Sequence, residues 1–168
     1  MKKIMEMLQN MKAKNEKKDN KGFSLVELII VIAIMAILVG IVGTQVIPYI
    51  NKSKVAKDQQ VLNSFSSAAV TAYAENAESM PTTGTLTIDV YTGSYGADSA
   101  EEKLAASIKK NTGYNEIADV KKQFASDAKT MTNDISIEIK IDDHEVTTSI
   151  DYGSSSPKEA VADVKATL

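Results

Sequence analysis

The chain has 168 residues and contains no cysteine, no tryptophan and no arginine. Without cysteine, disulfide bonds, thiolate metal sites and cysteine nucleophiles are excluded, and the fold must be held together by packing alone. The single histidine, His144, falls in a predicted hairpin turn, and no glycine-rich phosphate loop follows a predicted strand. We therefore predict a protein that is not an enzyme and uses no cofactor.

Positive charge is concentrated at the N-terminus. Residues 1–22 carry seven lysines and three acidic residues, a balance of +4, whereas residues 23–168 carry 12 lysines and 19 acidic residues, a balance of −7. A basic segment before an apolar one stays on the cytoplasmic side of a membrane. The acidic remainder would then face outward, and its charge argues against binding to nucleic acid.

An apolar run of 21 residues extends from Phe23 to Gly43, and its only polar side chains are Ser24 and Glu27. As a helix it would measure about 31 Å, which matches a hydrocarbon core of about 30 Å. The run is too long for a secretory signal peptide, and bulky Ile41 stands where cleavage after Gly43 needs a small residue. The simplest interpretation is a single membrane span.

Two residues do not fit a simple anchor. Gly22 lies between the basic and apolar segments, where a membrane span has no use for a helix-weakening residue. Glu27 lies one turn inside the span, and a carboxylate costs about 2.5–3.5 kcal/mol at mid-bilayer and less near an end. An ionisable residue in such a place is a functional candidate, and its charge should have a partner.

Residues 21–28, with the sequence KGFSLVEL, resemble the class III signal of type IV pilins and pseudopilins. The resemblance implies that a prepilin peptidase cuts between Gly22 and Phe23 on the cytoplasmic side and methylates the new amine of Phe23. The mature chain would have 146 residues. The lack of cysteine and the all-lysine basic complement resemble the pilins of anaerobic Gram-positive bacteria.

The resemblance also supplies a partner for Glu27. In the family, the amine at the new N-terminus is thought to pair with the glutamate of a neighbouring subunit inside the filament. A paired buried charge offsets much of its desolvation cost, so this pairing would select the correct offset between subunits. The alternative is that Glu27 extends to the nearby cytoplasmic interface without a partner.

The helical pattern continues beyond the apolar run. Apolar residues recur at spacings of three, four and seven, at Val55, Leu62, Phe65, Ala69 and Tyr73. Polar residues hold other positions, at Lys52, Lys54, Lys57, Asp58, Gln60 and Ser66. We predict one helix over residues 23–76, which packs the apolar face of its second half on a globular head and ends before Met80-Pro81.

Three residues are expected to weaken this helix. Pro48 removes the hydrogen bond to the carbonyl of Thr44, and Gly40 and Gly43 precede it. Pilins commonly have proline at the position of Thr44 and often glycine at that of Ala36, so this chain departs from the pattern in detail. We expect a pliable zone from Gly40 to Pro48; alternatively, the glycines allow close packing of helices.

The head is predicted to contain further helices and strands. Residues 85–91 alternate as a half-buried strand, residues 99–111 form a helix capped by Asp98 with Glu101 and ended by Gly113, and residues 115–129 form another helix. Residues 134–152 form a hairpin that sets Ile141 opposite Val146 and Ile137 opposite Ile150.

A cap at Ser156, followed by Pro157 and Glu159, predicts a C-terminal helix that docks through Val161, Val164 and Leu168. The result is an α+β fold, a long helix packed on a small antiparallel sheet, as the resemblance also implies. Asp142, Asp143 and Glu145 are the only loose calcium candidate, and charged turn tips are ordinary, so we expect no metal site.

These observations predict three segments: a leader over 1–22, a membrane and filament-core helix over 23–47, and the head with its helix over 48–168. The expected function is that of a type IV pilus subunit, held in the membrane with its N-terminus inside and polymerised with identical copies by pilus assembly machinery. One alternative is a pseudopilin of a type II secretion or DNA-uptake system. The other is an anchored binding domain that does not polymerise and keeps residues 1–22. The choice among motility, adhesion, aggregation and DNA uptake stays open.

Overall fold

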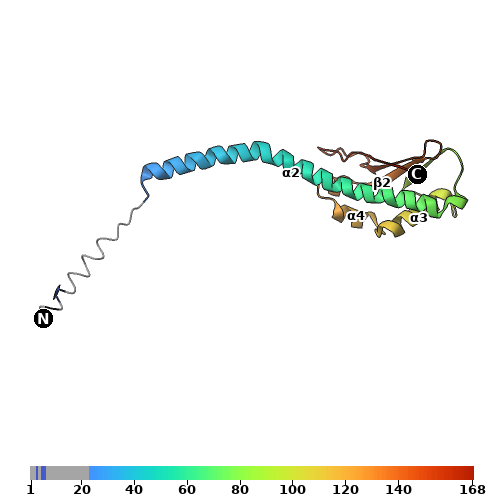
Figure 1. Cartoon of the computed structure of the whole chain (residues 1–168), viewed down its shortest axis with the longest axis horizontal. Coiled ribbons are helices and arrows are strands. Elements are labelled where there is room, and N and C mark those ends of the chain that lie inside the picture. Colours follow the sequence, from blue (N-terminus) through green and yellow to red (C-terminus); the bar gives the residue numbers. More distant parts are fainter. Residues whose placement is uncertain (1–2, 4, 7–22) are drawn as a thin grey trace. The chain divides into compact units, whose positions relative to one another are not determined.

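The computed structural model describes Lys3, Met5, Glu6 and residues 23–168. Gly22 and the other leader residues apart from Lys3, Met5 and Glu6 lie outside the described residues. The chain divides into two compact units, Met1–Gln45 and Val46–Leu168. Figure 1 shows the elements along the chain.

The longest element is helix α2, Leu25–Glu75, which closely matches the helix predicted over 23–76. It is followed by a single 3-10 turn, Ala77–Ser79. In the second unit one face of α2 is buried, and its residues are spaced three and four apart as an amphipathic helix requires: Asp58, Leu62, Phe65, Ser66, Ala68, Ala69 and Ala72.

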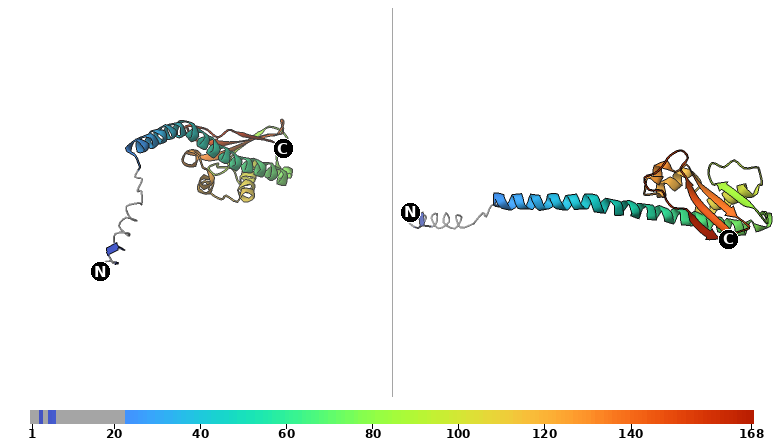
Figure 2. Two further views of the ribbon diagram at one scale, coloured as in Figure 1. Left: turned by 60° about the vertical axis from the view of Figure 1, so that its left-hand side comes forward. Right: turned by 90° about the horizontal axis from the view of Figure 1, so that it is seen from above.

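The second unit also contains a four-stranded antiparallel sheet in the order β1-β2-β3-β4. The strands are β1 (Thr85–Asp89), β2 (Asp134–Lys140), β3 (Glu145–Asp151) and β4 (Val164–Thr167). Three short helices complete the unit: α3 (Ala100–Thr112), α4 (Ile117–Gln123) and α5 (Ala128–Met131). Both views in Figure 2 show the sheet and these helices gathered around the later part of α2. The predicted α+β, pilin-like fold is confirmed.

The core lies between the buried face of α2 and the buried residues of the sheet. Ile135, Ile137 and Ile139 on β2 are fully buried, and Phe65 of α2 is also fully buried. The ring of Phe65 meets Tyr91 edge-on at 6.4 Å and stacks on Tyr114 at 6.1 Å. Aromatic contacts of this kind add to the burial energy. The Tyr91 hydroxyl donates to the Tyr114 carbonyl, and burial raises its pKa above the ordinary value.

The hairpin forms, but its predicted register is wrong by two residues. Ile139 lies opposite Val146 and Ile135 opposite Ile150, because the four-residue turn begins at Ile141. The Ile141 carbonyl accepts the amide of His144, which has a positive φ of 53°, and this contact closes the turn directly after the last pair of the ladder, Lys140 and Glu145. A shift of two keeps each side chain on its predicted face, so burial is unchanged.

The predicted C-terminal helix is wrong. Residues 157–163 are irregular, and Val164–Thr167 form β4, which pairs with β3. Short helices depend on tertiary packing, whereas a strand here satisfies main-chain groups of β3 that would otherwise be unpaired. Val161 and Val164 are nevertheless buried, and Leu168 is half-buried, as the docking prediction required.

The helix predicted over 115–129 is broken into α4 and α5 by an extended residue, Phe124. The cause is Asp58, which was predicted among the polar positions of α2 but is fully buried. Its carboxylate accepts hydrogen bonds from the amides of Ala125 at 2.6 Å and Ser126 at 3.0 Å. A continuous helix would direct these amides to its own carbonyls, so the Asp58 contact and an unbroken helix exclude each other.

Two further boundaries differ from prediction. The strand predicted over 85–91 ends at Asp89, because the buried Asp134 carboxylate accepts the amides of Tyr91 and Thr92 and turns the chain there. The N-cap of α3 is Ser99, whose hydroxyl accepts the Glu102 amide, and not Asp98. Gly113, at φ 77°, ends α3 as predicted.

Ser66 also departs from the predicted polar face, since it is 2% exposed, and its hydroxyl has no partner among the described residues. Its small size lets α2 approach the core at this position.

The Asp58→Asn variant tests the buried carboxylate. Asparagine offers one acceptor oxygen and turns an amide N–H₂ toward amides that need acceptors, so we expect a loss of about 1.5–3 kcal/mol in the free energy of unfolding. Denaturant unfolding of the full chain in detergent measures it. Asp143→Asn, at an exposed turn position, is the matched control and should change stability little. Equal stability of the two variants would contradict this account.

Candidate maturation and assembly site

The start of α2 is built by Ser24 and Glu27. The Ser24 carbonyl accepts the first helical hydrogen bond, from the amide of Leu28 at 3.1 Å. The Ser24 amide donates to Oε2 of Glu27, also at 3.1 Å. A glutamate three residues after the cap that takes the cap amide is one half of a capping box. Glu27 therefore holds an amide that the helix itself leaves unpaired.

The sequence analysis missed this local role of Glu27. Its signal was present in the spacing Ser24-x-x-Glu27 before an apolar run, which is typical of a helix start. A negative charge in the first turn is also favourable, because the N-terminal end of a helix carries partial positive charge. The role does not exclude an intermolecular one. The structure assigns only Oε2 to the cap, so Oε1 has capacity for a second donor.

Phe23 directly precedes this capped start. Its side chain is 81% exposed, and it lies outside α2. A cut before Phe23 would therefore leave its amine next to the residue whose own amide already binds Glu27. The structure thus brings Phe23, Ser24 and Glu27 together at one end of α2. Gly22, the fourth predicted site residue, lies outside the described residues.

The surface that follows is apolar and uncovered. The large hydrophobic side chains from Leu25 to Ile50 are exposed, by 42% at Val46 and 73% at Tyr49. Among the described residues α2 is the one helix long and apolar enough to cross a membrane, and its most apolar stretch has no buried residue. A helix that is hydrophobic all round is normally covered by lipid or by other helices. This chain provides no such cover in its described part.

The residues predicted to weaken α2 lie within the helix. Gly40 and Gly43 have open space where a side chain would begin, so nothing within the described chain requires glycine there. The Thr44 hydroxyl donates to the carbonyls of Gly40 and Ile41, a back-bonding pattern that often bends helices. Pro48 lies inside α2 and has no amide to donate. The pliable zone and the close-packing alternative both stay predictions.

Two carboxylates of the acidic turn, those of Asp142 and Glu145, accept hydrogen bonds from different parts of the fold. Asp142 accepts the amide of Gly84, whereas Glu145 accepts Nζ of Lys165 at 3.0 Å and the hydroxyl of Thr147. The hydrogen bond from Lys165 lowers the pKa of Glu145. No group of three metal-ligating side chains occurs among residues 23–168. The carboxylates serve separate contacts within the fold.

Comparison with known proteins identifies the N-terminal segment. Residues 17–43 match the prokaryotic N-terminal methylation motif, the class III signal peptide of type IV pilins. No curated protein and no solved structure matches the chain. The motif covers Phe23, Ser24 and Glu27 together with the first part of the exposed apolar helix. The chain therefore has the features of a type IV pilin-like or pseudopilin-like precursor, and its motif implies processing by a prepilin peptidase and handling by pilus assembly machinery.

Proposed function

We propose that this protein is a structural subunit of a type IV pilus. Residues 1–22 form a leader removed after Gly22, residues 23–47 form the membrane and filament-core helix, and residues 48–168 form the head with its helix. The observation that carries the proposal is the methylation motif placed on a capped helix start, directly before an apolar surface that the chain leaves uncovered.

The apolar surface suits two environments in succession. Before assembly the hydrocarbon of the membrane covers it, and the basic leader keeps the N-terminus inside. After cleavage, the same side chains pack against those of identical subunits in the filament. Lipid tails and apolar helices are similarly apolar, so the transfer between them requires little net change in hydrophobic energy. The heads, with 12 lysines and 18 acidic residues over residues 48–168 and so a net charge of −6, then face the exterior.

Glu27 and the methylated amine of Phe23 set the position of each subunit. Removing the leader creates a cation whose reference pKa is about 7.7–8.0, so it is largely charged at neutral pH. Oε2 of Glu27 keeps the helix start closed within its own chain, and Oε1 accepts the amine of a neighbour. A mispositioned neighbour would leave both charges buried without partners, which is far more costly than a matched pair.

Gly22→Ala tests the processing step. Prepilin peptidases cut after glycine in this motif, so we expect the variant to remain in the membrane as the full-length precursor. Gly43→Ala is the matched control, since it makes the same change in the apolar helix, where a side chain has open space. The intact mass of each membrane-extracted chain gives the result. A Gly22→Ala chain that begins at methylated Phe23 would contradict the proposed cleavage site.

Glu27→Ala and Glu27→Gln together separate the two roles of Glu27. Glutamine still caps the helix but carries no charge, whereas alanine removes both functions. If charge pairing controls assembly, both variants should be cleaved normally and should lower filament yield by about tenfold or more, because breaking a buried pair costs several kcal/mol.

Sheared surface fractions, quantified by immunoblot and electron microscopy, measure the yield from cells in which the variant is the sole subunit. Glu78→Gln removes an exposed charge in the head and serves as the control. Wild-type yield from Glu27→Gln would refute the pairing and leave capping as the sole role.

A further inference from the structure

The last strand of the sheet is joined to its neighbour by a long connection. β3 ends at Asp151 and β4 begins at Val164, so the 12 residues of 152–163 connect two antiparallel strands that lie side by side. Hairpin connections usually have about two to five residues. This length is more than local pairing of β3 with β4 requires.

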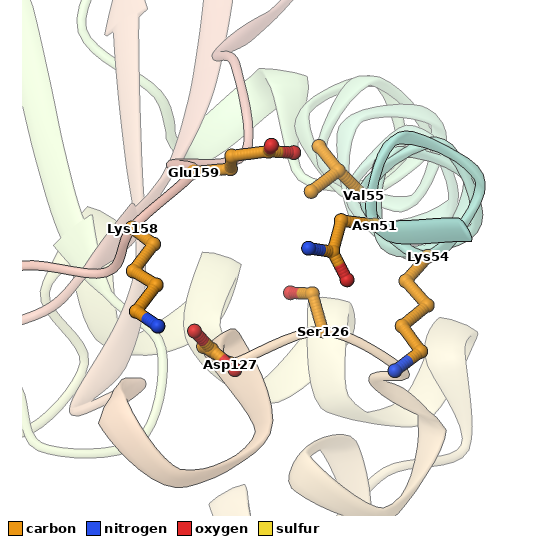
Figure 3. A pocket seen from close by; sticks show the side chains of 7 residues that line it. All are labelled: Asn51, Lys54, Val55, Ser126, Asp127, Lys158 and Glu159. Atoms are coloured by element: carbon orange, nitrogen blue, oxygen red, sulfur yellow. The ribbon is translucent and has the colours of Figure 1, made fainter. Parts of the chain in front are cut away.

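The connection is held loosely over its central part. Within the described structure, residues 156–160 take part in no hydrogen bond, whereas the amide of Val161 donates to the hydroxyl of Tyr152. A cavity of about 200 Å³ lies between the connection and the elements facing it. Figure 3 shows Lys158 and Glu159 on one side of this hollow, with Asn51 and Val55 of α2 and the Ser126–Asp127 turn around the rest.

The charged residues around the cavity do not fasten the connection either. Lys158 and Glu159 are exposed, and neither forms an ion pair with a described residue. The firm contacts lie closer to β4, where Val161 and Val164 are buried and Nε2 of Gln59 donates to the Ala162 carbonyl at 2.8 Å. Residues 153–168, the C-terminal arm, are therefore attached mainly by β4 and the residues just before it.

The sequence of the arm favours another conformation. Ser156, Pro157 and Glu159 form a helix-start pattern, and the docking residues Val161, Val164 and Leu168 have helical spacing. The structure places these last residues on an edge strand instead. A segment whose local preference conflicts with its tertiary state is held by the tertiary contacts alone, so it belongs to the less stable part of a fold.

β4 pairs with the edge of β3 in one defined register. The amide of Leu168 donates to the His144 carbonyl, and strand alternation then directs the main-chain groups of Val146 and Thr148 toward β4 as well. When β4 detaches, these groups and the pockets of Val161 and Val164 are left open. A second copy of the chain carries the identical strand, so it restores the same bonds and the same burial.

We propose that residues 153–168 are an exchangeable arm: β4 of one chain pairs with β3 of a second copy, in place of that copy's own β4. The absence of cysteine means that no disulfide holds the arm to its own head. Exchange links heads by main-chain hydrogen bonds, in addition to any contact between apolar helices. The inference does not depend on the proposed pilus function, because it concerns only contacts of the second unit.

Disulfide trapping tests the exchange cleanly, because the chain has no native cysteine. Thr147 and Lys165 are register partners of the non-hydrogen-bonded type. Such partners have Cα atoms about 4.5 Å apart, which a disulfide can join. Full-length Thr147→Cys and Lys165→Cys chains, distinguished by isotope labelling, are mixed in detergent and oxidised mildly. Mass spectrometry then measures the mixed disulfide.

The control mixes Thr147→Cys with Lys122→Cys, an exposed lysine on α4 that the β3–β4 register does not involve. Paired strands hold the two sulfurs together, so we expect at least about tenfold more mixed disulfide from the registered pair. Equal yields from the two mixtures would overturn the exchange.

Hydrogen exchange on the unaltered chain provides a second measurement. We expect the amide of Ala166, which faces β3, to exchange at least about tenfold faster than that of Ile137 in the central strand β2, since the arm opens locally. Equal protection at these positions would also overturn the proposal. Neither result bears on cleavage at Gly22, so a failed arm and a failed pilus assignment remain distinguishable.

Discussion

The protein depends on one constraint: it carries a long apolar helical surface that its own described chain does not cover. The exposed side chains from Leu25 to Ile50 need lipid or other helices around them. Ser24 and Glu27 cap the helix at the start of this surface. The carboxylate of Glu27 is thus a charged group within a segment that is otherwise almost entirely apolar. The methylation motif, over residues 17–43, includes the capped start and the first part of this apolar surface. The motif that implies processing and the surface that needs a covering therefore lie in the same segment.

Inside the head, two buried carboxylates decide the course of loops that hydrophobic burial alone leaves open. Asp58 accepts the amides of Ala125 and Ser126 and separates α4 from α5, whereas Asp134 accepts those of Tyr91 and Thr92 and ends β1. Both side chains are fully buried, where a carboxylate without donors would be costly. Each therefore fixes the path of a loop that lies far from it in the sequence.

The predictions that held depend on local residue patterns, and those that failed depend on contacts between elements. Patterns within one element predicted α2, the burial of the hairpin faces and the Gly113 cap, because side-chain periodicity and backbone preference are local properties. The register of β2 and β3 was missed by two residues, since a shift of two leaves every side chain on its face and the turn closed between Ile141 and His144 sets the position. The prediction of a C-terminal helix was wrong because a strand in this place forms main-chain hydrogen bonds with the edge of β3, which a helix could not form. For the candidate site, the motif residues were predicted, but the bond between Ser24 and Glu27 was not.

The sequence by itself determined the apolar helix, the acid near its start, the recognition motif around Gly22 and Phe23, and the α+β composition of the head. These follow from residue order over short distances, where spacing and charge are sufficient. Only the tertiary structure decided which polar residues of α2 are buried, where the helix of 115–129 breaks, and that residues 164–167 form a strand. Those outcomes depend on contacts with residues more than ten positions away in the sequence. The conformational preference of a local segment does not include the energy of such contacts.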